Sequence, residues 1–100
     1  MKQRRVILTP EARQDLFDIY DWIASNASPN VAISYLERLE TYCAGFETAS
    51  EHGHPRDDIL PGLRIVGFEK RVTIAFEVSD ELVTIFRLFY GGENWEAKIG

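Results

Sequence analysis

Cysteine, long apolar runs and positive charge are all scarce in this sequence of 100 residues. The single cysteine, Cys43, excludes an internal disulfide and a cysteine-based zinc cage. No apolar run reaches the roughly 18–20 residues that a transmembrane helix needs. The N-terminal stretch MKQRRVILTPEARQ has too short an apolar segment for a signal peptide. We therefore expect a cytoplasmic protein without membrane contact.

The shortage of positive charge argues against a protein that grips nucleic acid. Sixteen Asp and Glu against eleven Lys and Arg give a net charge of −5, whereas phosphate binding normally requires a basic surface. The acids concentrate in residues 10–51, which hold eight acids and two bases. Any basic patch must be small and local, and we expect no direct contact with nucleic acid.

What is present suits one packed domain. An apolar fraction of 45%, with 12% aromatic residues, is typical of a globular core and argues against disorder. The length predicts a single domain over residues 1–100.

The first half of the chain predicts a short strand over residues 4–8 and two helices. Thr9 and Pro10 have the residue types of an N-cap and a first helical residue, and Ser28 and Pro29 repeat the pattern. The short connection predicts an antiparallel helical hairpin. Residues at helical spacing are expected to be buried: Ala12, Leu16, Ile19 or Tyr20, and Ile23 in the first helix, and Ala32, Leu36, Leu39, Cys43 and Phe46 in the second.

The second half predicts a loop and then three strands. The segment HGHPRDDILPGL at residues 52–63 is rich in turn-forming residues. Strands over residues 63–68, 72–78 and 82–90 are separated by short turn-like segments, which predicts an antiparallel meander. The order is β-α-α-β-β-β, and the fold class is α+β, with the helical hairpin packed on an antiparallel sheet.

Several polar residues that resemble sites are interpreted as structural. His52 and His54 lack an obvious third metal ligand, so a solvated loop explains them better than a metal site. The segment Arg56-Asp57-Asp58 fits an Asx-type turn better than a catalytic site.

Helix residues with reactive side chains receive the same interpretation. The acids of the first helix, which are Asp15, Asp18 and Asp21, are expected to form a solvated face and not a carboxylate pair. Cys43 lies on the apolar stripe of the second helix, which favours a small core residue over a nucleophile. The helices carry more aromatic residues than one seam can bury, so some of them are expected to serve a partner surface: Tyr20, Trp22, Tyr35 and Tyr42.

Arginines of the predicted sheet favour a binding role. Arg64 and Arg87 lie within strands, and Arg71 opens one. On one side of the sheet they would form a positive strip that holds a phosphate or the acidic side chains of a protein partner. The structural alternative is that each pairs locally, with Glu69 or Glu77 as partners.

Three segments carry a family resemblance: LTPEARQDLFDIYDWI at residues 8–23, RDDILPGLR at 56–64 and FRLFYGGENWE at 86–96. Through them the sequence resembles the ParE branch of the RelE/ParE toxin superfamily over essentially its whole length. The resemblance implies the toxin half of a type II toxin–antitoxin module, in a hetero-oligomer with its antitoxin. The implied partner is ParD-like, with a ribbon-helix-helix half and a disordered tail that packs between the helices and the sheet.

The resemblance implies one of two activities, because the ParE branch poisons DNA gyrase whereas the RelE branch cleaves messenger RNA on the ribosome. RelE-like nucleases place one Arg at the start of the middle strand and another after the glycine that ends the last strand, where they stabilise developing charge. Arg71 takes the first place, but the second reads Gly92-Glu93-Asn94 and has no cation. We therefore expect a non-catalytic gyrase inhibitor without metal or cofactor.

The expected contacts with the target or the antitoxin follow from the same comparison. They are the arginines of the sheet and two aromatic residues near the C-terminus: Arg64, Arg71, Arg87, Tyr90 and Trp95. A RelE-like ribonuclease and a detoxified member that only binds its antitoxin remain the alternatives.

Overall fold

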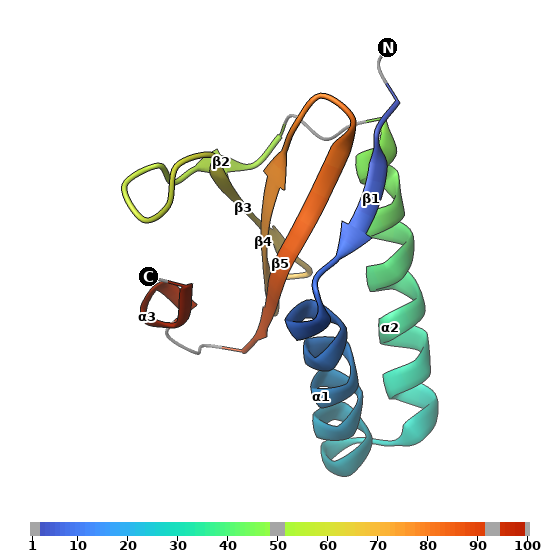
Figure 1. Ribbon diagram of the computed structural model, residues 1–100. Helices are drawn as coiled ribbons and strands as arrows, with labels where there is room; N and C mark the ends of the chain where they lie inside the picture. Colours follow the sequence, from blue (N-terminus) through green and yellow to red (C-terminus); the bar gives the residue numbers. More distant parts are fainter. Residues whose placement is uncertain (1–2, 49–51, 92–94, 100) are drawn as a thin grey trace.

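A five-stranded sheet carries a helical hairpin on one face (Figure 1), in a computed structural model that describes residues 3–48, 52–91 and 95–99. The α+β class and the β-α-α-β-β-β order are confirmed, with two short additions, β2 and α3. The elements are β1 (Arg5–Leu8), α1 (Pro10–Asn26), α2 (Pro29–Ala44), the 3-10 helix η1 (Gly45–Glu47), β2 (His54–Pro55), β3 (Leu63–Phe68), β4 (Val72–Val78), β5 (Leu82–Tyr90) and α3 (Trp95–Ile99).

Both long helices begin where the cap residues predict. The Thr9 hydroxyl accepts a hydrogen bond from the Ala12 amide at 3.0 Å, and the Ser28 hydroxyl accepts one from the Val31 amide at 3.1 Å. The predicted apolar stripe of the second helix is buried in full, and in the first helix Leu16 is only half-buried. None of the described helices has the length and apolar character that a bilayer crossing requires.

The sheet has the strand order β1-β5-β4-β3-β2. Strands β3, β4 and β5 form the predicted antiparallel meander, whereas β1 pairs with β5 in parallel, so the sheet as a whole is mixed. Strand β2 is a two-residue addition inside the predicted loop, paired with β3. It ends at Pro55, a residue that suits an edge strand because it has no N–H group to donate.

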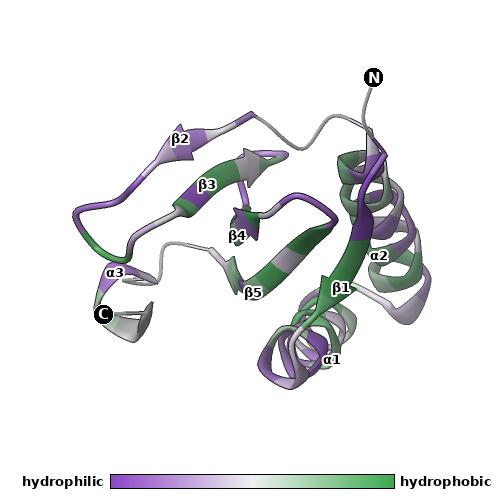
Figure 2. Ribbon diagram, turned by 45° about the horizontal axis from the view of Figure 1, so that its top comes forward, coloured by the Kyte–Doolittle hydropathy of each residue, from purple (hydrophilic) through white to green (hydrophobic). Residues whose placement is uncertain are grey.

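The two faces of the sheet are buried to different degrees. Helices α1 and α2 cover one face, where Ile74 and Phe76 of β4 join the main core. On the other face Leu63, Ala75 and Phe89 form a smaller apolar cluster. Figure 2 shows the hydropathy of the elements, with β3 and β5 largely hydrophobic and the helices of mixed character.

Asp15 corrects the sequence-based prediction of a solvated acidic face. Its side chain is buried and accepts three hydrogen bonds: from Arg87 Nε at 2.8 Å, from Arg87 Nη2 at 3.0 Å and from the Leu88 amide at 2.8 Å. Asp18 and Asp21 are exposed, as predicted.

The burial of Asp15 has a cause in the topology of the sheet. Strand β1 ends at Leu8, opposite Ile85, so the outer edge of β5 beyond that point has no partner strand. Thr9 completes the edge first, because its amide donates to the Ile85 carbonyl at 3.0 Å and its hydroxyl donates to the Phe86 carbonyl at 2.7 Å. Asp15 then accepts from the Leu88 amide, which lies further along the same edge. The start of α1 therefore replaces the missing strand.

We predict that Asp15→Ala lowers the free energy of unfolding by about 3 kcal/mol, because it removes the buried acceptor of three hydrogen bonds, two of them from a guanidinium. Urea unfolding followed by circular dichroism measures this change. Asp18→Ala is the matched control on the same helix and should change stability by less than about 0.5 kcal/mol. Equal effects of the two substitutions would contradict the structural role of Asp15.

Candidate functional site

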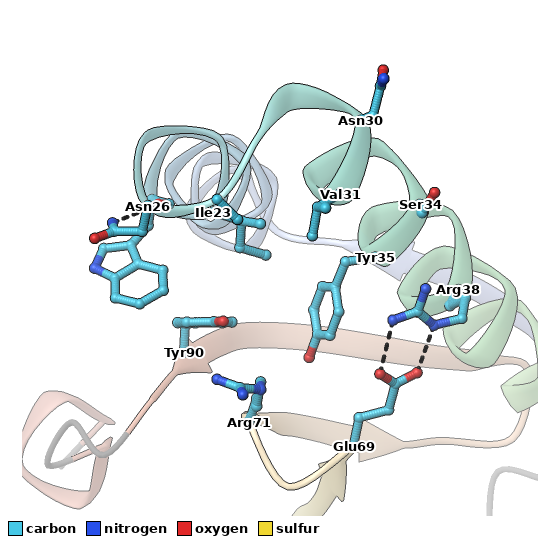
Figure 3. A pocket seen from close by; sticks show the side chains of 12 residues that line it. Ile23, Asn26, Asn30, Val31, Ser34, Tyr35, Arg38, Glu69, Arg71 and Tyr90 are labelled. Carbon is cyan, nitrogen blue, oxygen red and sulfur yellow. Dashed lines mark hydrogen bonds and ion pairs between the residues drawn. The ribbon is translucent and has the colours of Figure 1, made fainter.

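A pocket of about 660 Å³ lies where the connected ends of α1 and α2 meet the β3–β4 turn and the end of β5 (Figure 3). Aromatic and charged side chains from these four segments line much of it: Trp22, Tyr35, Arg38, Glu69, Arg71 and Tyr90. Two of the five residues expected to bind a partner, Arg71 and Tyr90, meet here.

A strained turn positions the charged residues of this pocket. Glu69 and Lys70 link β3 to β4 with φ angles of 49° and 58°. Two successive left-handed residues define the hairpin turn that normally takes Asn and Gly, and the conformation costs other residues roughly 1–2 kcal/mol each. The Arg71 amide closes the turn on the Phe68 carbonyl at 3.0 Å. Strain of this kind clusters at functional sites.

Arg38 of α2 holds the turn in place. Its guanidinium donates to both carboxylate oxygens of Glu69, at 2.8 and 3.0 Å, and lies 5.3 Å from the centre of the Tyr35 ring. These hydrogen bonds lower the pKa of Glu69 below its ordinary value. Both oxygens of Glu69 are thus occupied, and the side chain of Arg71 has no hydrogen-bond or ion-pair partner in the described parts of the chain.

Tyr35 lies at the inner wall of the pocket with its hydroxyl pointing toward the β3–β4 turn (Figure 3). Burial is the main cause that raises its pKa to about 12, so the hydroxyl keeps its proton at neutral pH. Tyr90 packs edge-on against Tyr35, with ring centres 6.1 Å apart, and Trp22 lies 5.0 Å from Tyr90. Trp22 is 52% exposed, so one of the helix aromatic residues does reach the surface.

Arg64 and Arg87 lie elsewhere, on opposite faces of the sheet. Arg64 is opposite Phe76 and Arg87 is opposite Ala75, and adjacent residues of a strand point to opposite faces. Arg64 donates to the His52 carbonyl at 3.0 Å, and Arg87 is held by Asp15. The sheet arginines therefore do not form one positive strip.

Trp95 begins α3 on the face of the sheet that the hairpin leaves open. Its ring centre lies 6.5 Å from that of Phe89, and the Arg56 guanidinium lies 5.4 Å from it. Arg56 also pairs with Asp58 and Glu96, each at 2.9 Å. The stretch Gly92-Glu93-Asn94, on which the comparison with RelE-like nucleases rests, lies outside the described residues.

The turn interpretation of the Arg56-Asp57-Asp58 segment agrees with its hydrogen bonds. The Asp57 carboxylate accepts from the Gly62 amide at 2.8 Å, across the loop that leads into β3. Gly62 itself has a φ of 83°, which a side chain would strain.

The histidines and the cysteine divide between surface and core. His54 is exposed, but His52 is half-buried with its ring 4.6 Å from Phe46 and 5.4 Å from Phe76, so the prediction of a solvated loop is wrong for His52. No three potential metal ligands gather among the described residues. Cys43 is buried as predicted, and burial raises its pKa to about 12.

Comparison with known proteins assigns the family. Residues 6–95 match the sequence model of a protein family. This family is described as the ParE toxin of the type II toxin–antitoxin system parDE. The chain belongs to the ParE toxin family. A solved chain of the chromosomal ParDE toxin–antitoxin system from P. aeruginosa superposes with a TM-score of 0.77. It is 21% identical, and the match covers 89% of this chain and 97% of that one, which shows a shared fold. The comparison with curated proteins gave no match.

We predict that Lys70→Gly stabilises this ParE-family protein by about 1 kcal/mol, because relief of the left-handed strain outweighs the entropy that glycine adds to the unfolded chain. Chemical unfolding measures the change. Glu81→Gly, in the β4–β5 turn where φ is not positive, should instead destabilise by about 0.5–1 kcal/mol. A loss of stability in both variants would show that the turn at Lys70 is not strained.

Proposed function

We propose that this ParE-family protein inhibits DNA gyrase through protein contact, has no nuclease activity and is neutralised by a ParD-like antitoxin in the cytoplasm. The observation that supports the absence of nuclease activity is the small number of available cations around Arg71 and Tyr90. The pocket there contains one other described cation, Arg38, and Glu69 engages it through both oxygens.

The described residues of the same pocket offer no suitable general base for proton transfer. A general base for attack by a ribose hydroxyl needs a pKa near the operating pH. The described lining of the pocket contains no histidine, and the pKa of Tyr35 is raised and not lowered. Both features favour a binding surface over a nuclease centre.

We predict that the purified protein inhibits supercoiling of relaxed plasmid by gyrase and accumulates cleaved DNA complexes. Arg71→Ala and Trp95→Ala should each weaken inhibition about tenfold if these side chains are binding hot spots. Arg5→Ala is the matched control, because Arg5 is an exposed cation in β1, opposite the first residue of β5. No inhibition at excess protein would contradict the proposal.

Two further outcomes would replace the proposal with one of its alternatives. Messenger cleavage in a translation extract that Arg71→Ala abolishes would identify a RelE-like ribonuclease. Antitoxin binding without gyrase inhibition or growth arrest would identify a detoxified member.

An apolar groove on the helical hairpin suits the antitoxin. A hollow of about 350 Å³ beside β1 and one of about 650 Å³ on the outer face of the hairpin share Arg13, Leu16 and Glu40. Two apolar residues that line the second hollow are exposed: Phe17 is 67% exposed and Ile33 is 48% exposed. The acids of that hollow, which are Asp21, Glu37 and Glu40, outnumber its one base, Arg13. This combination suits an amphipathic segment with apolar anchors and basic flanks.

We predict that Phe17→Asp weakens binding of the cognate antitoxin at least about tenfold, because it places a carboxylate in an apolar and already acidic groove. Isothermal titration calorimetry measures the affinity. Leu60→Asp is the control, since Leu60 is an exposed apolar residue outside both hollows. An unchanged affinity of the Phe17 variant would place the antitoxin elsewhere, and this result is independent of the gyrase assay.

A further inference from the structure

The Tyr35 hydroxyl is a buried donor without an acceptor. Tyr35 is 5% exposed, and its oxygen has no hydrogen-bond partner in the described parts of the chain. Buried polar groups of native proteins nearly always have a partner, because an unmade bond is destabilising. The oxygen borders the pocket near the β3–β4 turn, so the partner that it lacks would come from a molecule in the pocket.

Arg71 supplies a second unused donor at the same place. Its side chain extends beneath Tyr90 on the side of the pocket toward which the Tyr35 hydroxyl points (Figure 3). The nearest carboxylate in the lining, Glu69, already binds Arg38 through both oxygens. A neutral hydroxyl beside a guanidinium that is unpaired in the described residues is complementary to an oxyanion, because both groups can donate hydrogen bonds to it.

Aromatic rings form the wall beside these donors. Trp22 contacts Tyr90 with ring centres 5.0 Å apart and an interplanar angle of 47°, and about half of the Trp22 surface is exposed. An exposed indole in the same pocket as a cation favours a planar group on the ligand. The volume of about 660 Å³ lies in the usual range for small-molecule sites, which is roughly 300–1,000 Å³.

We propose that this pocket binds a small anion that carries a planar ring, with its oxyanion on the Tyr35 hydroxyl and the Arg71 guanidinium and its ring against Trp22. Aromatic carboxylates and nucleoside monophosphates share this chemistry. The site involves neither the hairpin groove nor α3, so it stands independently of the antitoxin and of Trp95.

Fluorescence of Trp22 tests the proposal. The chain has two tryptophans, so Trp95→Phe leaves Trp22 as the only reporter. We expect saturable quenching by benzoate or by adenosine monophosphate. Acetate, inorganic phosphate and adenosine, at matched ionic strength, should bind at least about tenfold more weakly, since each lacks either the ring or the oxyanion. The tighter of the two ligands, benzoate or adenosine monophosphate, identifies whether the pocket prefers aromatic carboxylates or nucleoside monophosphates.

Two substitutions separate a ligand site from a structural role. In the same background, Tyr35→Phe and Arg71→Gln should each weaken the ring-bearing anion about tenfold, because each removes a hydrogen bond to a charged group. Arg5→Gln removes an exposed cation in β1 and should leave the affinity unchanged. Tyr35→Phe should leave the melting temperature of the free protein unchanged or higher, yet reduce the rise that saturating ligand produces.

The proposal is overturned if neither benzoate nor adenosine monophosphate gives saturable quenching. It is also overturned if Tyr35→Phe and Arg71→Gln bind as tightly as the parent. A lower melting temperature of free Tyr35→Phe with unchanged ligand affinity would assign the hydroxyl a structural bond within the protein.

Discussion

The bond between Asp15 and the unpaired edge of β5 is the constraint on which the rest of the structure depends. Strand β1 covers only the first part of β5, and the start of α1 completes the edge through Thr9 and Asp15. This contact fixes where α1 crosses the sheet. Trp22 lies two helical turns beyond Asp15, on the same side of the helix. Fixing Asp15 at Leu88 therefore places Trp22 against Tyr90, and the same anchor that completes the sheet builds one wall of the pocket.

The bond to Asp15 also removes one arginine, Arg87, from those available for binding. Arg87 is held by Asp15, Arg64 by a backbone carbonyl, and Arg56 by two carboxylates. Arg38 is held by Glu69, so Arg71 is left with no hydrogen-bond or ion-pair partner in the described ranges. In a chain with a net charge of −5, these four arginines thus stabilise the fold, and Arg71 is the arginine of this set that can bind an anion.

Local sequence signals predicted most of the fold, but not the contacts that depend on topology. The caps at Thr9 and Ser28, the helical periodicity and the three-strand meander all rest on neighbouring residues, and all are present. The residue type predicts a solvated Asp15, because charged residues usually lie at the surface. Its spacing of three from Ala12 and four from Ile19 did place it on the buried stripe, and that was the available signal. The presence of Tyr35 and Arg71 in one pocket had no such signal, because α2 and the β3–β4 turn are far apart in the sequence.

The ParE fold explains the sheet and the hairpin, but it does not by itself explain the pocket between them. One fold can host different functions, and the residues of the site decide among those functions. Elsewhere this chain follows the local rules of helix caps and strand alternation, apart from a bulge between Ala75 and Phe76 and a buried His52 Nδ1 that has no hydrogen-bond partner among the described residues. At the pocket it departs from them twice, with two left-handed residues that are not glycine and a buried hydroxyl that has no partner among the described residues. Departures that cost stability persist where a sequence serves something other than folding. Tyr35 and Glu69 both line the cavity that contains Arg71, so a binding role for this cavity would account for both departures with a single cause.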